Sequence, residues 1–150
     1  MKIIAVGNSF YGDDGIGAAV LEKIRQDGLF PDAELIDVHT DALALLEHLA
    51  AEQKNVIVDA AQMGLEPGSV VGFRPDEVRM KIKSDHLSMH GFGLPEAFDL
   101  ADQLGRMPNN VLIVGVEPER IVIDKGLSGV VKEAVPRVIS IIQAEVQSDG

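Results

Sequence analysis

The stretch Ile3-Ile4-Ala5-Val6-Gly7-Asn8, followed after three intervening residues by Gly12-Asp13-Asp14-Gly15-Ile16-Gly17, decides the fold class of this chain. A short apolar run rich in β-branched residues is typical of a strand that is buried on both faces. The glycine-framed loop after it leads into Ile16, Val20 and Ile24, which fall on one stripe of an amphipathic helix. A strand, a loop and a helix in this order favour an α/β domain.

The two adjacent carboxylates in this loop, Asp13 and Asp14, point to the kind of ligand that it would hold. A helix N-terminus attracts anions, and a glycine loop at such a place often holds a phosphate. Two fixed negative charges should repel a phosphate, so the loop favours a cation. Both aspartates could instead only complement the helix dipole, and their spacing alone leaves that interpretation open.

Strand and helix patterns alternate along the rest of the chain. Further strands are expected at 33–38, 56–58, 70–73 and 111–116, and further helices from about 40 to 50, from 94 to 104 and from 128 to 146. Ser128 is expected to cap the last helix, and Pro136 to kink it. The pattern predicts a single domain over 1–150, a three-layer α/β sandwich with a mostly parallel twisted sheet of about five strands flanked by helices.

The longest stretch without a clear pattern is 74–93, which contains His86 and His90. A segment of this length is too long for a simple connector in a compact domain, so it is a candidate functional loop. It begins with a basic cluster that could contact an acidic partner, although a solvated face is the preferred interpretation. The cluster consists of Arg74, Arg79, Lys81 and Lys83.

Composition excludes several classes of function. The net charge of −11 opposes binding to nucleic acid and to anionic membranes. The chain has no cysteine, which excludes disulfides, thiolate nucleophiles and cysteine-ligated metals, so any metal must bind to oxygen and imidazole nitrogen. No apolar run is long enough for a signal peptide or a spanning helix, and we expect a cytoplasmic protein without a membrane partner.

Three chemistry-bearing residues come from segments that the fold should bring together: Asp14, Asp59 and His90. Asp14 follows the first strand and Asp59 ends the run 56–58, and ligands gather at the carboxyl ends of parallel strands. His90 precedes the helix at 94–104, whose positive end helps to keep an imidazole neutral. Each residue also has an ordinary interpretation. Asp14 could only complement the helix dipole, Asp59 could be a turn or cap residue, and His90 could be a surface histidine. His39 and His48 are weaker candidates.

Four motifs in order along the chain resemble those of the NiFe-hydrogenase maturation endopeptidases. In that family Gly-Asn leads to Asp-[Asp or Glu]-Gly-x-Gly, as it does here. The corresponding segments are Val6-Gly7-Asn8 with 12–17, Val58-Asp59-Ala60, Ser88-x-His90-x-x-Gly93-Leu94, and Val114-Gly115-Val116-Glu117-Pro118-Glu119 with Gly126-Leu127-Ser128. Together they cover essentially the whole chain.

The resemblance implies a function. Family members cleave a C-terminal extension from the large-subunit precursor of a NiFe hydrogenase after nickel has been inserted. Asp14, Asp59 and His90 correspond to the three metal-binding residues, and Asp14 or Asp59 would be the general base. Nickel would arrive in the substrate, and the isolated site would be empty or hold another divalent ion. We expect a monomer.

One segment departs from the family pattern. Where the better-known members carry Asp-x-Gly-Thr-x-Gly, this chain has Asp37-Val38-His39-Thr40-Asp41-Ala42. The departure leaves open which hydrogenase is the substrate. Two alternatives also stay open: a metal-binding or metallochaperone module that uses the same three residues without cleavage, and a nucleotide-binding protein, which Asp13 and Asp14 disfavour.

Overall fold

The computed structural model describes residues 1–85, 92–123 and 126–148. Its strands are β1 (Lys2–Ala5), β2 (Glu34–Asp37), β3 (Asn55–Gln62), β4 (Val70–Phe73), β5 (Ser84–Asp85) and β6 (Val111–Val116). Its α-helices are α1 (Ile16–Gln26), α2 (Ala42–His48), α3 (Val78–Lys81), α4 (Leu94–Gln103), α5 (Gly129–Lys132) and α6 (Val135–Gln147), and two 3₁₀ helices are η1 (Gly12–Gly15) and η2 (Pro75–Glu77).

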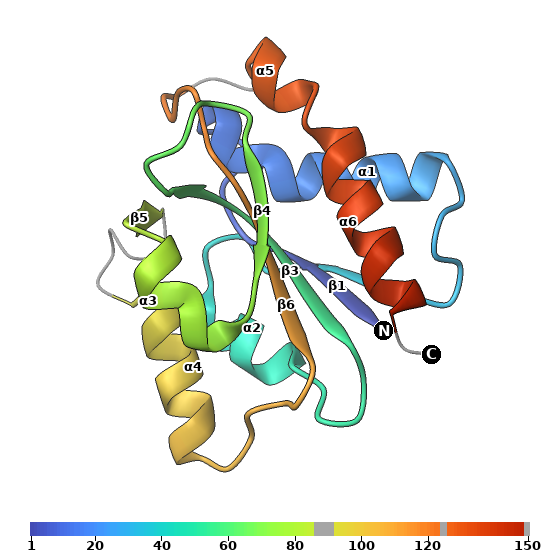
Figure 1. The fold of residues 1–150 in the computed structure, drawn as a ribbon, viewed down its shortest axis with the longest axis vertical. Helices are drawn as coiled ribbons and strands as arrows, with labels where there is room; N and C mark the ends of the chain where they lie inside the picture. The colour runs from blue at the N-terminus through green and yellow to red at the C-terminus, as the bar shows by residue number, and fades with distance from the viewer. Residues whose placement is uncertain (86–91, 124–125, 149–150) are drawn as a thin grey trace.

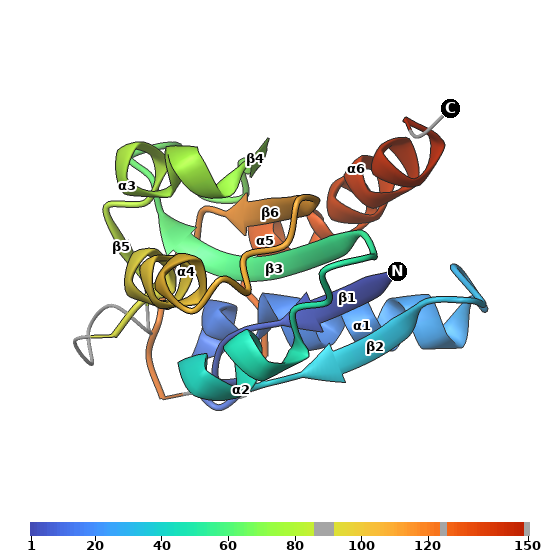
Figure 2. The same ribbon diagram turned by 90° about the horizontal axis from the view of Figure 1, so that it is seen from below.

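The strands form one twisted sheet in the order β2-β1-β3-β6-β4, and the first four are mutually parallel (Figures 1 and 2). The strand expected at 70–73 forms as β4, which is antiparallel to β6 at one edge of the sheet. The two-residue β5 adds a sixth strand beside the end of β3, also antiparallel. The predicted mostly parallel α/β sheet is thus confirmed, with β5 as a strand that the sequence did not predict.

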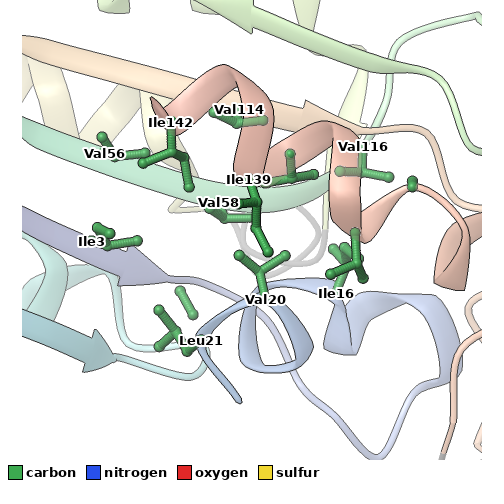
Figure 3. Close-up of a cluster of buried hydrophobic side chains, with 14 of the residues drawn as sticks. Ile3, Ile16, Val20, Leu21, Val56, Val58, Val114, Val116, Ile139 and Ile142 are labelled. Carbon is green, nitrogen blue, oxygen red and sulfur yellow. The ribbon is translucent and has the colours of Figure 1, made fainter. Parts of the chain in front are cut away.

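Helices cover both faces of the sheet, which makes three layers. α1 and α6 lie on one face and α2, α3 and α4 on the other (Figure 1). Figure 3 shows the packing of one helical layer on the sheet, where side chains of α1 and α6 meet those of β1, β3 and β6. The central strands are buried on both faces because successive side chains point to opposite helical layers. This explains their nearly unbroken apolar sequences.

Gly17 sets how closely α1 approaches this sheet. A Cβ atom at Gly17 would lie 2.9 Å from the Cβ of Ala5 and 2.9 Å from the carbonyl oxygen of Val58. Cβ atoms in folded proteins essentially never come this close to other heavy atoms, so only glycine fits between α1 and the strands. The close packing holds the start of α1 near the sheet, so that η1, which directly precedes α1, contacts β3.

The C-terminal helical region differs from its prediction because it contains two helices. α5 ends at Lys132 and α6 starts at Val135, with Pro136 in the first turn of α6. Proline is tolerated there because the first turn leaves its N–H groups unpaired in any case, so no kink inside one long helix is needed. Ser128 occupies the N-cap position of α5, but its side chain makes no capping hydrogen bond.

The segment 74–93 is more structured than expected, since η2, α3 and β5 lie within it. Its basic residues are also not a purely solvated face. Arg74 forms a two-pronged ion pair with the buried Glu145, with both nitrogen–oxygen distances 3.0 Å, and Glu145 raises the pKa of Arg74. Arg79 pairs with Asp99 on the surface. Among the described residues, no helix is long and apolar enough to cross a membrane.

Candidate functional site

Asp59 lies inside β3, at the point where its neighbour β1 has just ended. The last β1 pair joins Ala5 to Val58, whereas β3 continues and pairs Asp59 with Gly115 of β6. The prediction that the strand ends at Val58 was therefore wrong, because β6 and β5 extend the pairing of β3 to Gln62. Asp59 nevertheless stands at the carboxyl end of β1, where a parallel sheet opens to ligands.

Asp14 approaches the same place from η1, which contacts β3. Its side chain is fully buried, and its Oδ2 accepts a hydrogen bond of 2.6 Å from the backbone N–H of Asn8. Gly7 makes this arrangement possible: its φ is +130°, and a Cβ there would lie 2.2 Å from the carbonyl oxygen of Asp14. The Gly-Asn pair after β1 thus serves to hold Asp14 at the end of the strand.

Asp13 faces elsewhere and joins two distant loops. Its Oδ2 accepts hydrogen bonds from the N–H groups of Glu119 and Arg120 and from the hydroxyl of Ser128, and its Oδ1 accepts one from the Ser128 N–H, all between 2.7 and 3.0 Å. Burial alone would raise the pKa of Asp13, but these hydrogen bonds lower it below its usual value. Asp13 fixes η1 to the segment after β6, and this explains why Ser128 does not cap α5.

Electrostatics link Asp59 to Asp14. Burial first, and then the charges of Asp85 and Asp14, raise the pKa of Asp59 well above 3.8. Within residues 1–85, 92–123 and 126–148, neither carboxylate oxygen of Asp59 has a hydrogen-bond partner, although the residue is only 1% exposed. A buried carboxylate in this state is stabilised by a cation or by a proton.

Asp85 is a site-region residue that sequence reasoning missed. It is buried on β5, opposite Ala61 of β3. No sequence signal marked it, because it lies in the stretch whose pattern predicted only a long loop. Its place depends on a two-residue strand that forms against β3.

The remaining predicted site residues are histidines. His86 and His90 lie outside the described residues. His39 is exposed after β2 and His48 ends α2. In the part of the chain that the structure describes, no group of three histidine, aspartate or glutamate side chains is arranged to hold a metal ion.

The segment that departs from the family pattern keeps a glycine-like backbone. His39, at the place of the first glycine, has a φ of +55°, which side chains rarely adopt. The Asp37 carboxylate accepts a 2.9 Å hydrogen bond from the His39 N–H, and the His39 carbonyl accepts one from the Gly7 N–H. Asp41 caps α2 by accepting from the Ala44 N–H. These contacts hold the loop beside the Gly7 turn without either glycine.

Comparisons with known proteins agree on one family. The family model of the HycI hydrogenase maturation proteases matches residues 18–145. The hydrogenase expression/formation protein HupD of Bradyrhizobium diazoefficiens is 31% identical over 117 residues, which are 77% of this chain and 61% of HupD. The chain thus spans about three fifths of the length of HupD and of the similar HoxM of Azotobacter vinelandii. The hydrogenase 2 maturation protease of Escherichia coli is 27% identical over 99% of this chain and 91% of its own length.

Solved structures support the same assignment. The hydrogenase maturating endopeptidase HybD of E. coli superposes with a TM-score of 0.82 at 26% identity, covering 100% of this chain and 94% of HybD. HybD of Thermococcus kodakarensis gives a TM-score of 0.72 at 28% identity, covering 95% of this chain and 96% of that protein. The resemblance found in the motifs is therefore confirmed, and the chain belongs to the hydrogenase maturation protease family.

Proposed function

We propose that this chain is an endopeptidase that removes the C-terminal extension of a NiFe-hydrogenase large-subunit precursor after nickel has been inserted. Membership of the family and the full-length likeness to E. coli HybD support the reaction class. The observation that carries the proposal is the pair of buried carboxylates, Asp14 and Asp59, beside the carboxyl end of β1.

Nickel enters this proposal as part of the substrate. Asp59 and Asp14 would contact it through carboxylate oxygen, and His90, placed third by the motifs, through imidazole nitrogen. The buried Asp59 carboxylate supports this role, since its two oxygens have no hydrogen-bond partner among the described residues. A dication would offset the negative charge that burial makes costly. A precursor without nickel would leave that charge uncompensated and would bind poorly.

Cleavage requires a water molecule to attack the scissile carbonyl and a proton to reach the leaving amine. Asp14 or Asp59 would take the proton from the water and pass it to the amine nitrogen. Asp59 suits the role of proton acceptor because burial and the neighbouring acids raise its pKa above that of an ordinary aspartate, which strengthens it as a base. The chain has no cysteine to serve as a nucleophile.

The test is incubation of the purified protein with a nickel-loaded hydrogenase large-subunit precursor, followed by mass spectrometry of the precursor. Wild type should shorten it, and the Asp14→Asn, Asp59→Asn and His90→Ala variants should be strongly impaired. The matched control is Asp102→Asn, an exposed acid on α4 that makes the same charge change. A nickel-free precursor should stay intact.

Two results would contradict the proposal. One is a precursor that wild type leaves at full length, and the other is full activity in all three site variants. If the protein binds a divalent metal but leaves the nickel-loaded precursor intact, the chain is instead a metal-binding or metallochaperone module.

A further inference from the structure

Asp85 is a buried carboxylate on the same face of the sheet as Asp59. Asp85 lies directly opposite Ala61 in the antiparallel pair of β5 and β3, and opposite residues of such a pair project to the same face. Asp59 shares that face with Ala61, because the two lie two positions apart on β3. Asp85 is therefore the diagonal neighbour of Asp59, at a backbone separation of about 7–8 Å that side chains can bridge.

The residue between them leaves room for the two carboxylates to interact. Ala61 carries only a methyl group and is fully buried. Asp85 itself is 3% exposed, so little water screens its charge from Asp59.

Two like charges that share a buried place destabilise each other unless a cation lies near them. The described residues supply no hydrogen-bond partner to either oxygen of Asp59, which is what a site prepared for an incoming ligand leaves open. They also contain no group of three acidic or histidine side chains arranged for direct ligation. Asp85 is therefore suited to influence a bound cation through Asp59 and not as a direct ligand.

We propose that Asp85 is a positioning residue of the cation site, which orients the Asp59 carboxylate and adds a third negative charge around the divalent ion that Asp59 contacts. The inference rests on the proposed function, because it assumes that Asp59 meets the cation. It extends that function by placing a residue of β5, outside the three motif residues, in the surroundings of the site. Removal of such a supporting group typically weakens metal affinity by about 10- to 100-fold.

The experiment is a calorimetric titration of the full chain with Ni²⁺ alone, together with a thermal unfolding curve of each protein. The variants are Asp85→Asn, Asp85→Glu, Asp59→Asn and the exposed control Asp102→Asn. We expect Asp85→Asn to bind Ni²⁺ about 10-fold or more weakly. Asp85→Glu, which keeps the charge, should bind Ni²⁺ more tightly than Asp85→Asn, and the control should bind like wild type.

Thermal unfolding separates this role from a merely structural one. A purely structural role would lower the melting temperature of Asp85→Asn and leave its Ni²⁺ affinity unchanged, whereas a positioning role lowers the Ni²⁺ affinity at a temperature where wild type and variant are both folded. Lower melting temperature with unchanged affinity would overturn the inference, as would equal Ni²⁺ affinity in Asp85→Asn and wild type.

The failure of this inference is distinguishable from failure of the proposed function. If Asp59→Asn weakens Ni²⁺ binding and Asp85→Asn does not, only the role of Asp85 is refuted. If wild type takes up no Ni²⁺, or if Asp59→Asn binds as wild type does, the role of Asp85 falls because its target does not contact the cation. Precursor cleavage by wild type would still decide the reaction class separately.

Discussion

Replacement of Asp13 by asparagine should destabilise the whole domain, because this buried side chain joins η1 to the segment after β6. The carboxylate accepts four hydrogen bonds, from the N–H groups of Glu119, Arg120 and Ser128 and from the Ser128 hydroxyl. Hydrogen bonds to a charged group contribute about 1.5–3 kcal/mol each, against about 0.5–1.5 kcal/mol for neutral ones.

Asparagine can keep only part of this set. With its amide oxygen in the place of Oδ2, it would still accept from Glu119, Arg120 and the Ser128 hydroxyl, but as a neutral acceptor. Its NH₂ group would then face the Ser128 N–H, and two donors cannot pair, which leaves a buried N–H unsatisfied at a cost of about 1–3 kcal/mol. The lower desolvation cost of a neutral amide offsets part of the loss. We expect Asp13→Asn to lower the free energy of unfolding by about 3 kcal/mol.

The assay is equilibrium unfolding in urea, followed by circular dichroism, with Asp102→Asn as the control. The folded-state pKa of Asp13 lies below its ordinary value of 3.8, so its stabilisation is complete above pH 3.8 and is lost as the pH falls through the folded-state pKa. The difference between wild type and Asp13→Asn should therefore be constant near neutral pH and shrink in acid. A difference below about 0.5 kcal/mol at neutral pH would refute the role of Asp13, since that is the range of neutral surface changes.

Two further outcomes follow from burial and close packing. Burial raises the pKa of Asp59 above 3.8, so wild type should lose stability as the pH rises from 3.8 through the folded-state pKa. The Asp59→Asn variant should lack this loss. If the difference in unfolding free energy between the two proteins does not change with pH, the burial of an uncompensated acid is contradicted. Gly17→Ala should lower the free energy of unfolding by about 1–3 kcal/mol, because its Cβ meets Ala5 and the Val58 carbonyl. The control is Gly129→Ala, because a Cβ at Gly129 would have no atom within 4 Å. Urea unfolding should show its free energy of unfolding unchanged or raised by up to about 1 kcal/mol. Equal effects at the two glycines would disprove the close approach of α1.

The parts of the fold that sequence predicted correctly are those governed by local pattern. The apolar runs of β1, β3 and β6 and the stripe of α1 have the periodicity that burial requires, and α4 covers Leu94–Gln103, where a helix from 94 to 104 was expected. The errors arose where a distant partner overrides the local signal. β3 continues past Val58 because β6 and β5 pair with it. Arg74 does not belong to a solvated face because it forms an ion pair with Glu145.

The candidate site shows the same division. Asp14 and Asp59 were selected because acids that follow neighbouring parallel strands meet at one edge of the sheet, and the structure has β1 beside β3. Asp85 could not be selected in that way, since its two-residue strand has no periodicity of its own. His90 lies outside the described residues, and its role stays a prediction.

The sequence by itself determined the α/β class, the family and the loop in which two acids follow β1, because hydrophobic periodicity and motif order are properties of the chain. Only the tertiary structure decided what each acid does. Asp13 anchors a distant loop, Asp14 accepts a hydrogen bond from the Asn8 N–H beside β3, and Asp85 lies diagonally across from Asp59. The reason is physical: the state of a buried carboxylate depends on the donors and charges around it, and these come from segments far away along the chain.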